Sequence, residues 1–366
     1  MKKIISFLIF CVFFLSVSII KAEINTEYLE NIDALSGVAI DGLTGQILYA
    51  KNPNVKIPPA STVKLLTAMI VLDKLPLSQE IRISKAAEET SSTPPRLYEG
   101  EVYTVDDLLY LMLIKSSNQA AVALAEAVAG SEEKFSELMN EKAKFLGLKD
   151  SHFVTASGLP APNQYTTAYE LALLLYEALK YPHIKEIIST PVKVITSKKG
   201  RTLIVKNTNK LLFEDDIKDE ILGGKTGYTR LSKHCLVNVA KVNNRLIITS
   251  ILGAPYRDAL WEDTKKLIKF SELVLENRIS PVIINTAVNL SLPASFSPKD
   301  YYNSKAKGSY KKSKKYTKKS LKKKYVKKSF VKNSSKKKYV KRSSKKKVVK
   351  KYKKIYTASS QNKSNS

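Results

Sequence analysis

The chain has 366 residues and a formal net charge of +29, a balance that at first suggests a nucleic-acid-binding protein. Of its 62 Lys and Arg residues, however, 27 lie between Tyr301 and Ser366, where there is no Asp or Glu. The first 300 residues hold 35 basic against 33 acidic side chains, which excludes a strongly basic globular part and assigns the charge to a C-terminal tail.

The N-terminus has the pattern of a signal peptide, predicted over residues 1–22. Lys2 and Lys3 precede an apolar stretch from Ile4 to Ile20, and Ala22 supplies a small residue at the expected cleavage position. The apolar stretch is also near the short limit for a retained membrane anchor. Both interpretations predict export, to the periplasm or to the outer face of the cytoplasmic membrane or cell wall.

The predicted strands lie near both ends of the nearly neutral part, with helices between and after them. Strand patterns occupy Ser36–Gly42, Gln46–Ala50, Cys235–Val242 and Arg245–Leu252. Helical patterns occupy Thr62–Leu75, Thr104–Gly147, Tyr169–Lys180 and Arg257–Asn277. This order predicts a mixed α/β (α+β) fold: an antiparallel sheet built from both ends of the domain and flanked by helices, with an inserted all-helical subdomain.

Ser61 and Lys64 are the first chemical candidates. The pair Pro58-Pro59 precedes a helical pattern, so Ser61 should lie at a helix N-terminus. At this spacing on a helix the hydroxyl and the amine share one face. A lysine whose pKa is lowered by burial or by a second cation can remove the serine proton and create a nucleophile. Taken alone, however, Ser-x-x-Lys more often marks a solvated pair.

Two further short motifs could belong to the same site. Ser116-Ser117-Asn118 lies between helical runs, and its ordinary alternative is a helix N-cap. Lys225-Thr226-Gly227 falls in a strand-like region, where Lys225 and Gly227 would face the same side. Its alternative is a surface turn.

The order and spacing of the three motifs are far more specific than any one of them. Ser-x-x-Lys is followed after 55 positions by Ser-x-Asn and after 109 more by Lys-Thr-Gly, as in penicillin-recognising serine enzymes. The contexts Asp41–Gly45, Pro59–Thr67 and Gly224–Thr229 resemble the low-molecular-mass penicillin-binding proteins of the D-alanyl-D-alanine carboxypeptidase family. The resemblance runs from about Thr26 to Asn277. It implies a fold like that of penicillin-binding proteins and serine β-lactamases, with a catalytic domain over residues 23–279.

The resemblance also implies the catalytic roles. Ser61 would attack the peptide bond between two terminal D-alanines of a peptidoglycan stem peptide, with Lys64 as its base. Ser116 would pass a proton to the leaving amine, and the backbone N–H groups of Ser61 and Tyr228 would form the oxyanion hole. β-Lactam antibiotics would be covalent inhibitors that acylate Ser61.

Substrate binding would fall to residues of the second and third motifs. By resemblance, Asn118 would hold the substrate amide, and Lys225 and Thr226 would receive the free carboxylate. Gly227 allows the substrate backbone to approach closely. Arg245, just before the last predicted strand, is expected to assist Lys225 and Thr226.

Three alternative functions share parts of this pattern. A serine β-lactamase carries all three motifs, but Thr166–Glu170 resembles the carboxypeptidase pattern and not the deacylating-glutamate context of class A enzymes. A DD-endopeptidase that cuts cross-links has the same motifs. A non-catalytic basic envelope-binding protein is disfavoured because the motif residues are intact.

The C-terminal region is predicted to hold a linker over residues 280–300 and a disordered Lys-rich tail over residues 301–366. Such a density of like charge prevents a packed core. The tail is expected to bind an anionic envelope surface, at about 1 kcal/mol per basic residue near an anionic membrane. No physiological nucleic acid is expected as a partner, because the predicted signal peptide directs the chain out of the cytoplasm.

Neither a metal nor a cofactor is expected. His152, His183 and His234 are widely spaced in the sequence and have no metal-ligand pattern. Cys235 is the one cysteine left after signal removal and is expected to be a buried apolar residue on a strand.

Overall fold

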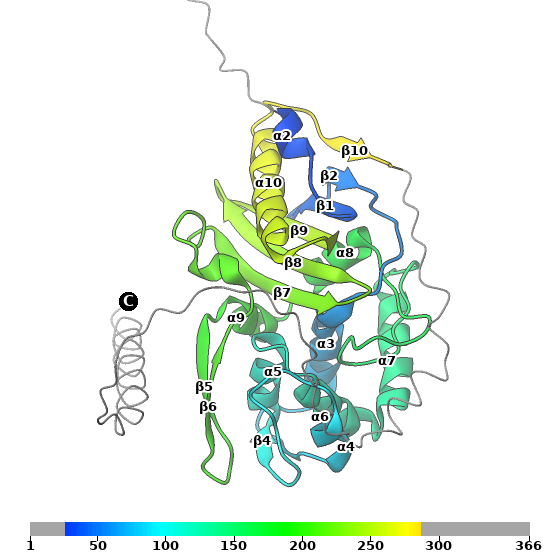
Figure 1. Cartoon of the computed structure of the whole chain (residues 1–366), viewed down its shortest axis with the longest axis vertical. Helices are drawn as coiled ribbons and strands as arrows, with labels where there is room; N and C mark the ends of the chain where they lie inside the picture. The colour runs from blue at the N-terminus through cyan, green and yellow to red at the C-terminus, as the bar shows by residue number, and fades with distance from the viewer. Residues whose placement is uncertain (1–25, 287–366) are drawn as a thin grey trace, which may run out of the picture. The chain divides into compact units, whose positions relative to one another are not determined.

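The computed structural model describes residues 26–286, and its centre is one six-stranded sheet (Figure 1). The strand order is β10-β2-β1-β9-β8-β7. The strands are β1 Ser36–Asp41, β2 Ile47–Lys51, β7 Ile221–Thr229, β8 Lys233–Val242, β9 Arg245–Ala254 and β10 Val282–Ile284. All neighbours pair antiparallel except β10, which runs parallel to β2 at one edge. The predicted sheet built from both ends of the domain is confirmed.

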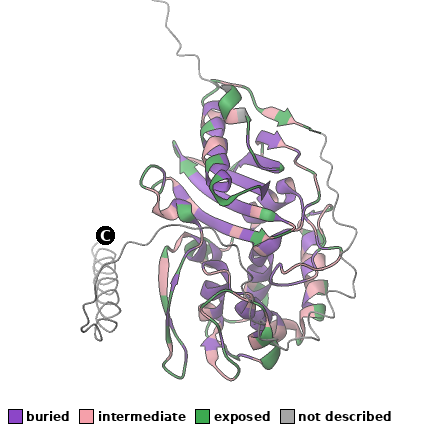
Figure 2. Cartoon of the chain, in the orientation of Figure 1, coloured by how far each residue is buried: buried purple, intermediate pink, exposed green. Residues whose placement is uncertain are grey.

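Helices cover both faces of the sheet. Helix α10 (Arg257–Leu275) packs on one face with the short α2 (Thr26–Glu30), and α8 (Ala168–Ala178) packs on the other (Figure 1). In β8 and β9 successive apolar residues alternate between two cores, so that Val237 belongs to one core and Leu236 to the other. The strands are therefore buried along most of their length (Figure 2), as expected for a sheet with helices on both faces.

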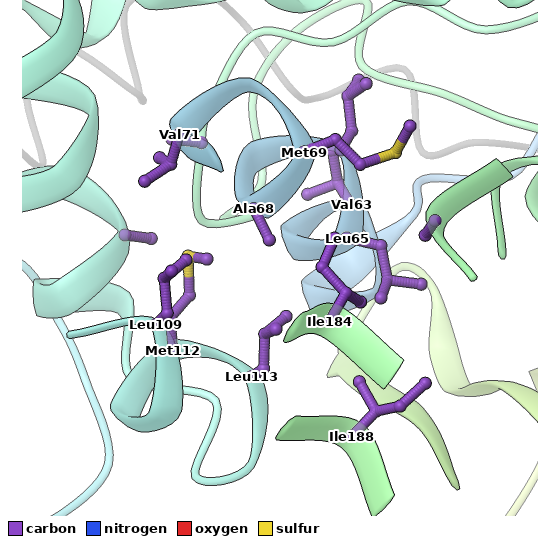
Figure 3. Close-up of a cluster of buried hydrophobic side chains, with 14 of the residues drawn as sticks. Val63, Leu65, Ala68, Met69, Val71, Leu109, Met112, Leu113, Ile184 and Ile188 are labelled. Atoms are coloured by element: carbon purple, nitrogen blue, oxygen red, sulfur yellow. The ribbon is translucent and has the colours of Figure 1, made fainter. Parts of the chain in front are cut away.

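A mainly helical block is inserted between β2 and β7. It contains η1 Ala60–Val63, α3 Lys64–Lys74, α4 Lys85–Glu89, α5 Val105–Leu113, α6 Asn118–Ala129, α7 Glu132–Phe145 and α9 Pro182–Ser189. Helix α3 is central, since it contacts α5, α6, α7, α8 and α9. Its apolar side chains meet those of α5 and α9 in the close-up of Figure 3, where the labelled residues are Val63, Leu65, Ala68, Met69, Val71, Leu109, Met112, Leu113, Ile184 and Ile188.

Local signals explain several boundaries. Thr104 and Asp107 form a capping box at the start of α5, because each side chain accepts the backbone N–H of the other residue. Gly130 ends α6 with a φ of 80°. Asn243 and Asn244 both have positive φ and join β8 to β9 in a tight hairpin.

The structure corrects two details of the prediction. The inserted block is not all-helical, because it carries the two-stranded sheets β3 (Glu80–Arg82) with β4 (Val102–Thr104) and β5 (Val192–Thr196) with β6 (Thr202–Lys206). The predicted linker begins too early, since β10 lies within it and the Thr286 N–H donates to Asn52 Oδ1. The predicted signal peptide and tail lie outside the described residues.

Candidate active site

Ser61 lies on the 3-10 turn that leads into α3, as its predicted place at a helix N-terminus requires. Thr62 Oγ1 donates to the Pro59 carbonyl oxygen at 2.6 Å and stabilises the turn. Lys64 is the first residue of α3, so its side chain and that of Ser61 share a face. The distance from Lys64 Nζ to Ser61 Oγ is 2.7 Å.

The Lys64 amine is fully buried, with 0 % of the residue exposed. Besides Ser61 Oγ, it contacts Asn118 Oδ1 at 2.7 Å and the carbonyl oxygen of Ser157. A neutral amine has two hydrogens and one lone pair. It can therefore donate to Asn118 and Ser157 while its lone pair accepts the Ser61 hydroxyl proton, which is the arrangement that a general base needs.

Electrostatics favour the neutral form of Lys64. Burial first, and then the charge of Lys225, hold the pKa of Lys64 well below its ordinary value, and Glu132 partly opposes this. Burial also lowers the pKa of Lys225 to about 7. Because two neighbouring ammonium groups repel each other, we assign the proton to Lys225 and the neutral amine to Lys64.

The second motif connects the two lysines. Ser116 follows α5 and has a φ of 64°, a conformation that turns the chain sharply before α6. Its Oγ accepts from Lys225 Nζ at 2.9 Å. Asn118 begins α6, and its Nδ2 donates to the Ser91 carbonyl oxygen at 2.7 Å, which leaves Oδ1 facing Lys64. Ser117 caps α6, so the ordinary N-cap role of this motif is also present.

The third motif lies on β7, the edge strand next to the helical block (Figure 1). A Cβ added to Gly227 would lie 2.9 Å from Ala60 Cβ and 3.0 Å from Ser61 N, so glycine lets the strand pass close to the Ser61 turn. Lys225 and Gly227 thus face the same side, as predicted. Thr226 Oγ1 lies 2.7 Å from Thr208 Oγ1.

The expectation that Arg245 assists Lys225 and Thr226 is wrong. Lys225 pairs with Val237, which pairs with Ser250, whereas Arg245 is five residues further along β9. At about 3.3 Å per residue, this separates Arg245 from that row by roughly 16 Å. Its guanidinium instead pairs with the buried carboxylate of Asp41.

Arg257 acts electrostatically on His234, which lies beside the strand of the third motif. Arg257 is exposed at the first turn of α10, and its charge helps to lower the pKa of His234, after the larger effect of burial. The His234 ring is 4.5 Å from that of Tyr228, to which His234 is paired across β7 and β8. The sequence signal that could have identified Arg257 is its position between the last predicted strand and the long helix that follows.

The Ser157 carbonyl is a second feature that the motifs did not reveal. It contacts Lys64 Nζ and lies 3.4 Å from Ser61 Oγ, although 96 residues separate the two serines. A carbonyl group leaves no side-chain signature, so only the fold could show its role.

A cavity of about 500 Å³ lies elsewhere, between β2, β9 and the end of α10, and Arg245 and Arg278 line it. It contains none of the motif residues, and we place the site at Ser61 because the buried lysines and hydrogen bonds converge there. Within residues 26–286 no group of three or more His, Cys, Asp and Glu residues could hold a metal ion. Cys235 is buried, and burial raises the pKa of its thiol to about 12.

Similarity to known proteins agrees with this geometry. The family model described as D-alanyl-D-alanine carboxypeptidase matches residues 22–256. The chain belongs to this family. Membership in the D-alanyl-D-alanine carboxypeptidase family confirms the predicted resemblance, and with it the class of serine peptidases to which the three motifs pointed.

Similar proteins are named for two different activities. D-alanyl-D-alanine carboxypeptidase DacF of Bacillus subtilis is 36 % identical over 227 residues, 61 % of this chain and 58 % of DacF. The chain therefore spans less than two thirds of that relative. D-alanyl-D-alanine endopeptidase of Pseudomonas aeruginosa is 34 % identical over 65 % of this chain and 76 % of its own length.

The fold is also that of a solved family structure. D-alanyl-D-alanine carboxypeptidase of Mycobacterium tuberculosis H37Rv matches with a TM-score of 0.64 and 27 % identity, covering 69 % of this chain and 96 % of that one. The predicted fold class is confirmed. Among the helices of residues 26–286, none combines the length and apolar character needed to cross a membrane.

Proposed function

We propose that the chain is a serine-type D-Ala-D-Ala carboxypeptidase that removes the terminal D-alanine from peptidoglycan stem peptides. The observation that carries the proposal is the 2.7 Å contact between Ser61 Oγ and the buried Lys64 amine. Lys64 accepts the hydroxyl proton as Ser61 Oγ bonds to the peptide carbonyl carbon. Collapse of the tetrahedral intermediate breaks the C–N bond and leaves an acyl-enzyme.

The remaining motif residues have separate tasks. Ser116, held by Lys225, passes a proton to the departing D-alanine nitrogen and receives in exchange the proton that Lys64 took from Ser61, so that the Lys64 amine is neutral again. Water then attacks the ester, Lys64 takes the water proton, and Ser61 is regenerated with release of the shortened peptide. The Ser61 and Tyr228 backbone N–H groups stabilise the oxyanion, at about 3 kcal/mol per donor.

Substrate recognition depends on charge and on the edge strand. Asn118 binds the substrate amide, and the peptide backbone is received along the edge strand β7, on which Gly227 lies. Lys225, Thr226 and Arg257 receive the free carboxylate of the terminal D-alanine. A β-lactam mimics this dipeptide end, so penicillins acylate Ser61 and act as inhibitors.

The direct test is release of D-alanine from a peptide that ends in D-Ala-D-Ala. We expect release by the native chain and none by Ser61→Ala, measured by a coupled D-alanine assay. The same two proteins are then given a cross-linked stem-peptide dimer. Cleavage of the dimer without D-alanine release would contradict the proposal and indicate an endopeptidase, the activity for which the Pseudomonas aeruginosa relative is named.

Arg257 and Arg245 provide a matched pair for the carboxylate site. We expect Arg257→Ala to raise KM for the peptide by about tenfold, because a hydrogen bond between charged groups contributes on the order of 1.5–3 kcal/mol. Arg245→Ala should leave KM unchanged, since its partner is Asp41. Steady-state kinetics of both variants measure the two KM values. A larger rise in KM for Arg245→Ala than for Arg257→Ala would reject the assignment of Arg257 to the carboxylate site.

Export and the tail complete the proposal. Residues 1–22 direct the chain out of the cytoplasm, and the 27 basic residues of 301–366 hold it on an anionic envelope surface. The comparison of the full chain with a truncation after Asp300 on anionic vesicles tests this. Equal binding of both proteins at low salt would rule out the tail as the tether.

A further inference from the structure

The loop Thr155–Leu159 contacts the catalytic pair Ser61 and Lys64, and it is held by hydrogen bonds to residues outside the three motifs. Its Ser157 carbonyl oxygen contacts Lys64 Nζ and lies 3.4 Å from Ser61 Oγ. The position of this one oxygen therefore influences both reacting groups. What holds the loop in place decides how well the amine and the hydroxyl are aligned.

Two bonds attach the loop just before that carbonyl. The Ala156 N–H donates to Glu132 Oε1 at 3.2 Å, and the Ala156 carbonyl oxygen accepts from Thr67 Oγ1 at 2.8 Å. Thr67 is on α3, one turn after Lys64, and Glu132 is the first residue of α7. A carboxylate at a helix N-terminus is stabilised by the helix dipole.

We propose that Glu132 is a positioning residue for the Ser61–Lys64 pair: its carboxylate holds the Ala156 N–H and thereby sets the Ser157 carbonyl against the Lys64 amine. The proposal deepens the proposed function and rests on Lys64 acting as the base. Glu132 does not touch the substrate in this account. It acts through the loop and through its charge.

The negative charge of Glu132 also affects the pKa of Lys64. Within residues 26–286 the charged groups that act on Lys64 are Lys225 from β7, which lowers its pKa, and Glu132 from α7, which raises it. A base works best with a pKa near the working pH. The charge of Glu132 opposes the lowering of the Lys64 pKa by burial and by Lys225.

Three variants separate the two effects. Glu132→Gln keeps an oxygen for the Ala156 N–H and removes the charge, whereas Glu132→Ala removes both. Glu133→Gln is the matched control, because Glu133 is the next residue of α7 and is exposed. The readout is the second-order rate of labelling by fluorescent penicillin between pH 4 and 9. The full chain is used throughout.

We expect the acid limb of the labelling profile to move to lower pH by roughly half a unit or more in Glu132→Gln, because loss of a nearby negative charge favours the neutral amine. The plateau rate should stay within about threefold of the native rate, since the loop bond survives. In Glu132→Ala the plateau should fall about tenfold. Glu133→Gln should reproduce the native profile.

Either an unmoved acid limb in Glu132→Gln or a native plateau in Glu132→Ala overturns the proposal. Titration of the Lys64 amine by ¹⁵N NMR, with the signal assigned by its loss in Lys64→Met, gives a readout that needs no penicillin. If the native chain is not labelled at all, the proposed function fails. The NMR titration still decides whether Glu132 raises the pKa of Lys64.

Discussion

Replacement of Lys64 by Met is expected to lower the rate of penicillin acylation by about 10³-fold or more. Methionine fills nearly the same space in the buried position but cannot accept the Ser61 proton. Proton transfer by a positioned base contributes typically about 10²–10⁴-fold to a rate, and Lys64 Nζ is the amine hydrogen-bonded to Ser61 Oγ. Stopped-flow or gel-based labelling with fluorescent penicillin measures the effect.

Lys74→Met is the control for this prediction. Lys74 is on the same helix α3 but is exposed at its last turn, so its loss should leave the acylation rate unchanged. Thermal unfolding of both variants separates lost chemistry from lost folding. Acylation of folded Lys64→Met at more than about a tenth of the native rate would identify another base.

Substitution of Gly158 by Ala is expected to impair both folding and acylation. Gly158 has a φ of 76°, and a Cβ there would overlap the carbonyl oxygen of Ala60, next to Ser61. The strained backbone and the overlap should cost roughly 2–4 kcal/mol of unfolding free energy. Displacement of the Ser61 turn by about 1 Å should slow acylation about 10²-fold.

Gly147→Ala provides the comparison, because Gly147 has nearly the same φ, 77°, and a Cβ there would meet no atom within 4 Å. The unfolding free energy of this variant should fall by only roughly 1–2 kcal/mol, the cost of a left-handed backbone at alanine, and its acylation rate should be unchanged. Denaturant unfolding and penicillin labelling, run on both proteins, check the pair. Equal acylation by the two folded variants would show that the Gly158 contact does not position Ser61.

The sequence predicted most reliably those features that depend on a single helix or a single turn. Pro58-Pro59 and the helical pattern after them placed Ser61 at a helix start, and the spacing to Lys64 put both side chains on one face. Tight turn signals were equally informative, since Asn243-Asn244 joins β8 and β9, two interior strands of the sheet. These features depend on local backbone preferences, which a sequence carries directly.

The register in which distant strands pair could not be predicted from the sequence. Arg245 was assigned to the site by its resemblance to a family arginine, but the pairing of β7, β8 and β9 decides which residues share a row. Arg257 acts on His234, the partner of Tyr228 across β7 and β8, because α10 starts shortly after the end of β9. A shift of register changes the neighbours of every residue on a strand, so motif spacing alone does not determine them.

The burial of the two lysines was also hidden in the sequence. Each lysine read alone is a typical surface residue, yet Lys64 and Lys225 are both 0 % exposed. Their low pKa values come from helices and a strand that are far apart in the chain. The short elements β3, β5 and β10 were missed for a related reason, because strands of three to five residues carry little pattern of their own.

The account depends most directly on the Ser61 hydroxyl being the nucleophile. The native chain is treated with benzylpenicillin, digested, and analysed by mass spectrometry for the site of the penicilloyl group. We predict one adduct, on the peptide that contains Ser61, and none in Ser61→Ala. An adduct on another residue, or the same modification in Ser61→Ala, would contradict the account.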